Sequence, residues 1–151
     1  MERSHKPIVI LIAEDDDDDF LLMMEAFEES RLLNAIYRVK NGEELMHFLT
    51  NENTENEEMS FPKPALILLD LNMPKMDGRE ALKAIKSNPE LHTIPVIVLT
   101  TSGSEEDIMR SYELGANSYV RKPVKFDEFL AAVSLLRKYW VELVALPTAD
   151  M

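Results

Sequence analysis

The stretch that decides the fold is Ala65-Leu-Ile-Leu-Leu-Asp70-Leu-Asn-Met-Pro-Lys-Met-Asp77-Gly78. Five apolar residues are followed by a carboxylate, then by a proline and an Asp-Gly turn signal. Such a run predicts a buried strand that ends at Asp70, where the chain enters a loop. A single Asp after a strand commonly caps a helix or forms a turn, so its meaning depends on what else lies nearby.

Four further strands are predicted on either side of this stretch. Residues 8–13 and 96–99 are short, unbroken apolar runs, which are typical of strands buried on both faces of a parallel sheet. Residues 35–40 alternate weakly between apolar and polar side chains, as an edge strand does. Residues 117–121 form the last of the predicted strands.

Apolar residues at helical spacing predict a helix after each strand. The first is expected to reach about Arg31 from a solvated acidic start at residues 16–19. The fourth begins at a capping box opened by Ser104 and ends at Gly115. The last continues to about Ala145, and its apolar residues are expected on one stripe: Phe126, Phe129, Leu130, Val133, Leu136 and Trp140.

This alternation of strands and helices predicts an α/β fold, in which helices cover both faces of an open, five-stranded parallel sheet. Ligands of such sheets bind beyond the carboxyl ends of the strands. The polar residues that follow the predicted strand ends should therefore share one rim: Glu14, Asp15, Asp70, Thr100 and Lys122.

Three carboxylates at one rim repel one another, and a divalent cation would relieve that repulsion. Oxygen donors without cysteine suit Mg²⁺, which accepts one or two carboxylates together with water and phosphate oxygens. Lys122 would add a fixed positive charge and Thr100 a hydroxyl, a combination that a transferring phosphoryl group requires. Because carboxylates form acyl phosphates, Asp70 is the expected nucleophile.

The composition limits the classes of function. The 151 residues suit one domain over residues 1–151, with a core from about 7 to 145 and no room for an output domain. With 28 acidic and 16 basic residues, the net charge of −12 argues against nucleic-acid binding. The apolar runs are too short for a membrane helix, and the absence of cysteine is compatible with a reducing cytoplasm.

The chain resembles the receiver domain of response regulators over nearly its whole length. The residues that carry the match follow one another in the family's order: Glu14-Asp15, Asp70 and the segment up to Gly78, Thr100, Tyr119 and Lys122-Pro123. This resemblance implies a flavodoxin-like (βα)5 fold, doubly wound, with five parallel strands in the order 2-1-3-4-5.

By the same resemblance, Asp70 accepts the phosphoryl group. Asp15, Asp70 and the backbone carbonyl of Asn72 would bind Mg²⁺. Glu14 completes the acidic pocket, and because its arm is longer than that of the usual Asp, its contact with the metal is expected to run through water.

The resemblance also implies how the site responds. Thr100 and Lys122 would contact the phosphoryl group. Tyr119 would be an aromatic switch that turns inward when Thr100 is drawn to the phosphate. The peptide bond between Lys122 and Pro123 would be cis, a geometry that aims the lysine and that is accessible only before proline.

A finer resemblance is to stand-alone receivers that are paired with bacterial phytochrome histidine kinases. It rests on the long loop before the third strand, the run Leu99-Thr-Thr-Ser102 and residues 139–147. The apolar end of the last helix leaves three interpretations open: it folds back onto the domain, joins two copies as a homodimer, or docks on the kinase. The expected readout surface combines the fourth helix, fifth strand and fifth helix.

The sequence therefore predicts a phosphorelay response regulator that takes a phosphoryl group from a histidine kinase onto Asp70 with Mg²⁺ and signals through protein–protein contacts. It would catalyse only its own phosphorylation and dephosphorylation. Two alternatives remain. A Mg²⁺-dependent phosphohydrolase with an aspartyl-phosphate intermediate would need an acid where Asn72 stands. A phosphorylation-independent scaffold would use the same fold.

Overall fold

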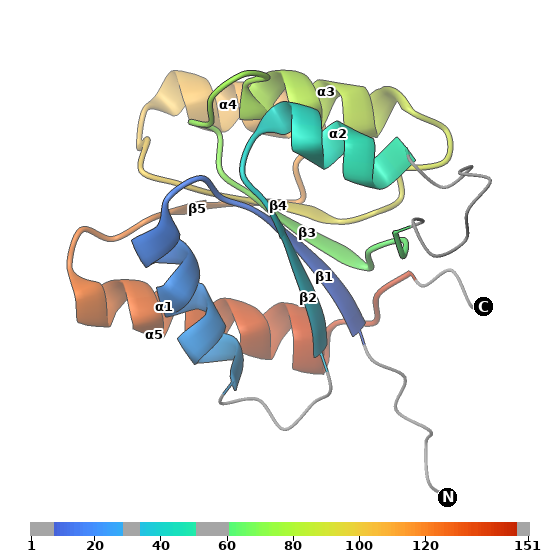
Figure 1. Ribbon diagram of the computed structural model, residues 1–151. Helices are drawn as coiled ribbons and strands as arrows, with labels where there is room; N and C mark the ends of the chain where they lie inside the picture. The colour runs from blue at the N-terminus through green and yellow to red at the C-terminus, as the bar shows by residue number, and fades with distance from the viewer. Residues whose placement is uncertain (1–7, 29–33, 51–60, 148–151) are drawn as a thin grey trace, which may run out of the picture.

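Five parallel strands form the sheet of the computed structural model, in the order β2-β1-β3-β4-β5 (Figure 1). The structure describes residues 8–28, 34–50 and 61–147. The strands are β1 (Ile8–Ala13), β2 (Asn34–Val39), β3 (Leu66–Leu69), β4 (Val96–Thr100) and β5 (Ser118–Arg121). The helices are α1 (Asp17–Glu28), α2 (Gly42–Thr50), α3 (Gly78–Ser87), α4 (Glu105–Glu113) and α5 (Phe126–Arg137), which a π-helix, η2 (Lys138–Leu143), continues. The predicted flavodoxin-like fold and strand order are confirmed.

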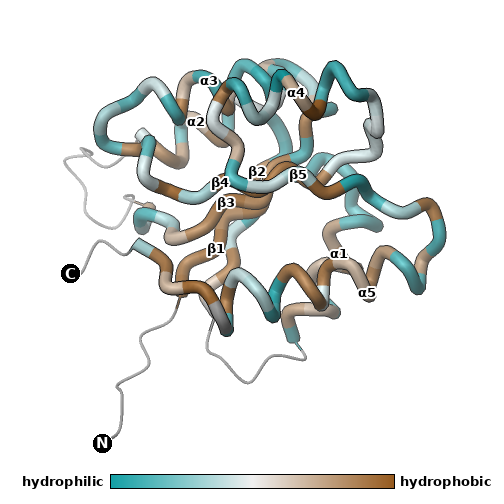
Figure 2. Tube along the Cα trace, turned by 180° about the vertical axis from the view of Figure 1, so that it is seen from behind, coloured by the Kyte–Doolittle hydropathy of each residue, from teal (hydrophilic) through white to brown (hydrophobic). Residues whose placement is uncertain are grey.

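The central strands bury both of their faces, which explains their unbroken apolar sequences. Successive side chains of a strand point to opposite sides of the sheet. The set that packs with α2 and α3 is Leu11, Ala13, Ile67, Leu69, Val96 and Val98. The set that packs with α1 and α5 is Ile10, Ile12, Leu66, Leu68, Ile97 and Leu99. Figure 2 accordingly shows the middle of the sheet as the hydrophobic centre of the molecule.

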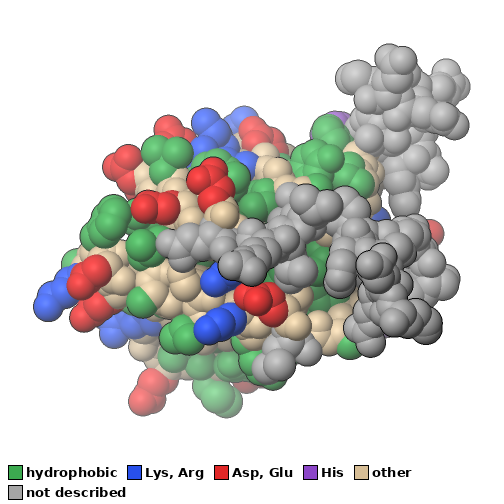
Figure 3. Space-filling view, turned by 90° about the horizontal axis from the view of Figure 1, so that it is seen from below, with side chains coloured by type: hydrophobic (Ala, Val, Ile, Leu, Met, Phe, Trp, Pro, Cys, Tyr) green, Lys and Arg blue, Asp and Glu red, His purple; other side chains and the backbone are tan. Residues whose placement is uncertain are grey.

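The helices form a layer on each face of the sheet. Helices α1 and α5 lie on one face and α2, α3 and α4 on the other (Figure 1). Seen from below, the α1–α5 side presents hydrophobic, acidic and basic side chains together (Figure 3). Among the described residues, no helix has both the length and the apolar character needed to cross a membrane.

The fourth helix starts and stops where the capping signals place it. The Ser104 hydroxyl accepts a hydrogen bond from the backbone N–H of Asp107 at 3.0 Å, and α4 begins at the next residue, Glu105. Gly115 follows the helix in the left-handed region, with φ of 108°. The first helix was expected to reach Arg31; the described part of α1 ends at Glu28, and residues 29–33 lie outside the described residues.

Phe126 begins the predicted apolar stripe of α5 but is not buried with the rest of it. Phe126 is 61% exposed, whereas Phe129 is 4% exposed and belongs to the core. Phe126 is the first residue of the helix and follows Val124, which is fully exposed. Helical periodicity gives the face on which a residue lies, but it does not say whether that end of the helix is covered.

The end of the last helix folds back onto the domain. The π-helix closes with a hydrogen bond from the Val144 N–H to the Tyr139 carbonyl at 3.0 Å. Val141 is 5% exposed, and Trp140 and Leu146 pack against the cluster shared by the sheet, α1 and α5. The tail therefore packs Trp140, Val141 and Leu146 onto the domain, while Tyr139 remains 54% exposed.

We expect Val141→Ala to lower the free energy of unfolding by about 1–3 kcal/mol, because it removes buried methyl groups and leaves a cavity. Leu135→Ala is the matched control. It removes a larger side chain from the same helix, but Leu135 is 69% exposed, so we expect a change of about 0.5 kcal/mol or less. Urea unfolding measures both. Equal losses in the two variants would contradict the described packing of the tail.

Candidate functional site

The carboxyl edge of the sheet brings the predicted acidic residues together. Glu14 and Asp15 directly follow β1, and Asp70 directly follows β3, which is the neighbour of β1. Each offers one carboxylate oxygen, and these oxygens lie within 4.8 Å of one another. Glu14 is completely buried and Asp70 is 6% exposed, whereas Asp15 is open to solvent. The edge thus gathers two buried carboxylates and one exposed carboxylate in a cluster, which we call the acidic pocket.

Lys122 provides the positive charge of this pocket. Its ammonium donates hydrogen bonds to Glu14 Oε1, to Asp70 Oδ2 at 3.4 Å and to Asp19 Oδ2 at 3.0 Å. Burial opposes the charge, but the hydrogen bond and charge of Glu14, with the other carboxylates, outweigh it and raise the pKa of Lys122. The lysine therefore stays protonated at neutral pH.

Glu14 is an acidic side chain that is buried away from solvent. Burial raises the pKa of Glu14, and the nearby charge of Asp70 raises it further, while the Lys122 ammonium works in the opposite direction. Crowded carboxylates of this kind are relieved by a second cation. The hard oxygen donors of Glu14, Asp15 and Asp70 fit a divalent cation of the Mg²⁺ type.

Asp19 was not expected in the site, because residues 16–19 were predicted to be a solvated helix start. Asp19 lies four residues after Asp15 in the first turn of α1. Its side chain contacts the Lys122 ammonium of the pocket. The sequence carried no local signal for this contact, because Asp15 precedes the helix and Lys122 is 103 positions away from Asp19.

Arg38 is a second residue whose contact with the site was not predicted from the sequence. It stabilises the loop between β1 and α1. Its Nε donates to the Glu14 carbonyl at 3.0 Å, and its Nη2 lies 2.8 Å from Asp17 Oδ1. Its guanidinium also sits 4.5 Å from the centroid of the Phe20 ring. Three contacts from one rigid group fix the loop that holds Glu14 and Asp15.

The loop after β3 holds Asp70 in place through close backbone packing. The Gly78 N–H donates to the Leu71 carbonyl at 3.0 Å. A Cβ at Gly78 would come within 2.5 Å of the Asp70 carbonyl oxygen, so only glycine fits this position. Lys75 accommodates the turn with a left-handed φ of 64°. The Asp-Gly signal in the sequence thus marks a turn at which the backbone packs closely against Asp70, the candidate phosphoacceptor.

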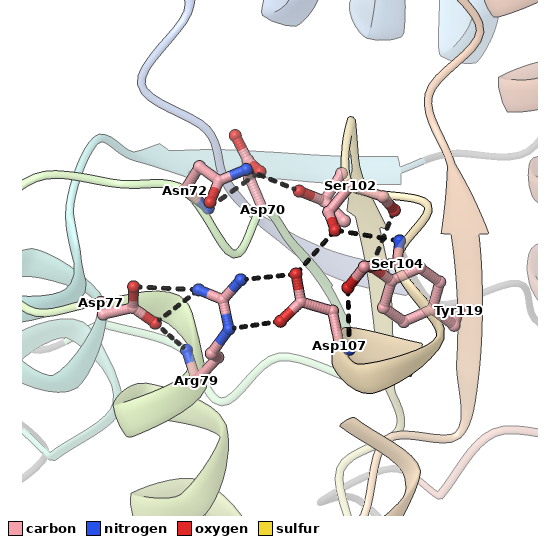
Figure 4. Close-up of polar contacts among 9 residues, drawn as sticks. Asp70, Asn72, Asp77, Arg79, Ser102, Ser104, Asp107 and Tyr119 are labelled. Atoms are coloured by element: carbon pink, nitrogen blue, oxygen red, sulfur yellow. Dashed lines mark hydrogen bonds and ion pairs between the residues drawn. The ribbon is translucent and has the colours of Figure 1, made fainter. Parts of the chain in front are cut away.

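Asn72 connects Asp70 with Thr100. Its backbone N–H donates to Asp70 Oδ1 at 3.2 Å, and its side-chain amide donates to Thr100 Oγ1 at 3.3 Å (Figure 4). Thr100 is completely buried at the end of β4. These contacts bring Asn72 and Thr100 to Asp70 as predicted, and the Asn72 carbonyl as a metal ligand remains a prediction.

Tyr119 lies half-buried beside the loop that follows Thr100. Its hydroxyl donates to the Ser102 carbonyl at 2.8 Å, and its ring packs against the core cluster of α2 and α3 (Figure 4). Burial is the main cause that raises the pKa of the Tyr119 hydroxyl. The hydrogen bond connects Tyr119 to Ser102, which lies two positions after Thr100. The role of Tyr119 as a switch stays a prediction.

The prediction of a cis peptide bond before Pro123 is wrong for this structure, because the bond is trans. The trans form is the more stable isomer of such a bond by about 0.5–1 kcal/mol. With this bond trans, the Lys122 N–H donates to the Thr100 carbonyl at 2.6 Å, and the ammonium reaches Glu14 and Asp70.

Three comparisons relate the chain to known proteins. The model of the response regulator receiver domain matches residues 10–134. Response regulator Rcp1 of Synechocystis sp. is 41% identical over 148 residues, which are 98% of this chain and 99% of that protein.

Solved structures of similar proteins agree with the sequence relatives. The Mn²⁺-bound form of Rcp1 superposes with a TM-score of 0.88 at 42% identity, covering 94% of this chain and 100% of the other. The phosphorylated cyanobacterial phytochrome response regulator RcpA superposes with a TM-score of 0.87 at 38% identity, covering 95% and 100%.

We expect Mg²⁺ to raise the thermal midpoint of the protein, because a ligand that binds only the folded state stabilises it, by about 2.7 kcal/mol at a hundredfold excess over Kd. Asp15→Asn should abolish the rise, since it removes one pocket carboxylate. Asp18→Asn removes the same charge from an exposed position of the same segment and should preserve the rise. A midpoint that does not respond to Mg²⁺ in the parent protein would contradict the metal site.

Proposed function

The chain belongs to the response regulator receiver domain family, and from this premise we propose that Asp70 accepts a phosphoryl group from a histidine kinase. The observation that carries the proposal is the position of Asp70 at the carboxyl edge, beside the buried Lys122 ammonium and within the acidic pocket. The role of the protein in phosphorelay signalling follows from its family. The residues and their individual roles are our proposal.

The residues of the acidic pocket and its neighbours have different roles in the phosphoryl transfer. A carboxylate oxygen of Asp70 attacks phosphorus, the O–P bond forms, and the P–N bond to the kinase histidine breaks with its electron pair left on the imidazole. Lys122 balances the charge of the phosphoryl oxygens, and the Thr100 hydroxyl donates to one of them. Asp15, Asp70 and the Asn72 carbonyl would hold Mg²⁺, with Glu14 contacting it through water, and the cation would neutralise further charge on the phosphoryl oxygens.

The output of the protein, in our proposal, is contact with other proteins. Phosphorylation shifts an equilibrium between conformations, in which Thr100 and Tyr119 move together. The surface of α4, β5 and α5 offers apolar groups for recognition: Met109, Tyr112, Val124 and Phe126 are 48–100% exposed. A homodimer through this surface and the exposed Tyr139 of the tail is the second use that these side chains support.

We propose a sensor histidine kinase of the phytochrome type as the partner, because similar proteins of nearly the same length are phytochrome response regulators. We also propose that the exchange takes place in the cytoplasm, since a chain without cysteine suits a reducing compartment. No reaction on an outside substrate is part of the proposal.

The two alternatives are not favoured. An aspartyl-phosphate phosphohydrolase would need an acid or base at the position of Asn72, whose amide cannot act as one and instead donates to Thr100. A scaffold whose function does not depend on phosphorylation would not need a buried lysine that contacts both Glu14 and Asp70.

With acetyl phosphate and Mg²⁺, we expect the protein to gain the mass of one phosphoryl group, and Asp70→Asn to abolish the gain. Asp127→Asn is the control, because it removes an exposed carboxylate from the first turn of α5. Intact-mass spectrometry measures both. Rapid turnover of the donor would favour the phosphohydrolase, and no adduct with any donor or kinase would favour the scaffold.

We expect Lys122→Ala to retain some adduct but to lose the conformational response to it, because no ammonium remains to draw the rearranged loops to the phosphoryl group. Amide hydrogen exchange of α4, β5 and α5, with and without phosphorylation, measures the response. Lys125→Ala removes an exposed lysine three positions away and should respond like the parent. A normal change in amide exchange on phosphorylation of Lys122→Ala would show that this lysine is not part of the switch.

A further inference from the structure

Arg79 joins the first turns of α3 and α4 by an ion pair with two contacts. Its Nε donates to Asp107 Oδ1 at 3.0 Å, and its Nη2 lies 2.9 Å from Asp107 Oδ2 (Figure 4). Its third nitrogen, Nη1, donates to both oxygens of Asp77 at 3.2 and 3.0 Å. A guanidinium held on both edges in this way has a defined position, which a single-point contact of a lysine would not give.

On the α4 side, the bridge reaches the loop that follows Thr100. Asp107 Oδ2 also accepts a hydrogen bond from the Ser102 hydroxyl at 2.6 Å. The Ser102 carbonyl in turn accepts from the Tyr119 hydroxyl at 2.8 Å. Asp107 therefore connects Arg79 with a loop residue that is two positions after Thr100 and that also contacts Tyr119.

On the α3 side, the bridge reaches the loop that carries Asp70. Asp77 caps α3 by accepting from the Arg79 N–H at 2.7 Å, so the capping residue holds both the backbone and the side chain of Arg79. The next residue, Gly78, packs against the backbone of Asp70 and Leu71. A short, tightly packed segment thus connects Asp70 with Arg79.

The charges suit a bridge that stays formed at neutral pH. The hydrogen bonds from Arg79 and Ser102 hold the pKa of Asp107 below its ordinary value. The side chains of Arg79 and Asp107 are 30% and 23% exposed. The ion pair between Arg110 and Glu113 on the same helix is different, because those side chains are 54% and 60% exposed and 3.6 Å apart. Such an exposed pair contributes little.

We propose that Arg79 and Asp107 are positioning residues that couple the state of Asp70 to α4. The bridge ties the loop of Asp70 to the loop after Thr100 at their helical ends, so the two loops and the first turn of α4 move as one unit. Phosphorylation then reaches α4 by two routes, through Thr100 and through Arg79. This inference rests on the proposed function, because it needs a phosphoryl group at Asp70 as the input.

The test compares amide hydrogen exchange in the first turn of α4 with and without phosphorylation by acetyl phosphate and Mg²⁺. In Arg79→Gln we expect the adduct to form, and the phosphorylation-dependent change in exchange to shrink by about 2- to 30-fold, the range expected when a coupling residue is removed. Arg79→Lys keeps the charge and should restore part of the response. Arg110→Gln, the matched control on the exposed pair, should respond like the parent.

Asp107→Asn and the double variant Arg79→Gln/Asp107→Asn complete the test. If the two residues act as one bridge, the double variant loses no more of the response than either single variant. A full response in Arg79→Gln, or additive losses in the double variant, would overturn the inference while leaving the function of Asp70 intact. An unchanged α4 in the phosphorylated parent would also overturn it. If the parent protein forms no phosphoryl adduct, the proposed function of Asp70 itself is contradicted.

Discussion

The ammonium of Lys122 is buried among carboxylates, and the arrangement of the whole carboxyl edge depends on this contact. The side chain of Lys122 is 4% exposed and that of its partner Glu14 is fully buried. Neither charge could be buried alone, because removing an unpaired ion from water costs several kcal/mol. The pair can form only if β1 and β5, which are separated by β3 and β4, end at the same edge. Parallel strands meet this condition.

The site combines charge with rigidity, and two arginines provide much of the rigidity. Arg38 holds the loop after β1 by a backbone carbonyl, a carboxylate and an aromatic ring. Arg79 holds the start of α3 against the start of α4. Arg38 pairs with Asp17, and Arg79 pairs with Asp77 and Asp107, so each side chain orders a loop and balances the carboxylates that it contacts.

The sheet and the central residues of the site could be predicted because their signals are local. Unbroken apolar runs require burial on both faces, and the residue after each run lies at the carboxyl edge. This reasoning gave Glu14 and Asp70, while Lys122 followed from the end of the fifth predicted strand, which is not an unbroken apolar run. The outcome depended on neighbours elsewhere: Phe126 lies on the predicted stripe but is 61% exposed, and Lys122 reaches its partners with Pro123 in the trans form.

The amino-acid sequence alone determined the order of elements, the edge at which the functional side chains gather and the chemical types present there. Only the tertiary structure decided which charges pair. Lys122 and Asp19 are 103 positions apart, and Arg79 and Asp107 are 28 apart. Periodicity and capping signals act over one turn or one strand, whereas these contacts depend on how helices are rotated and seated on the sheet. That packing is set by the whole core at once, so no local pattern records it.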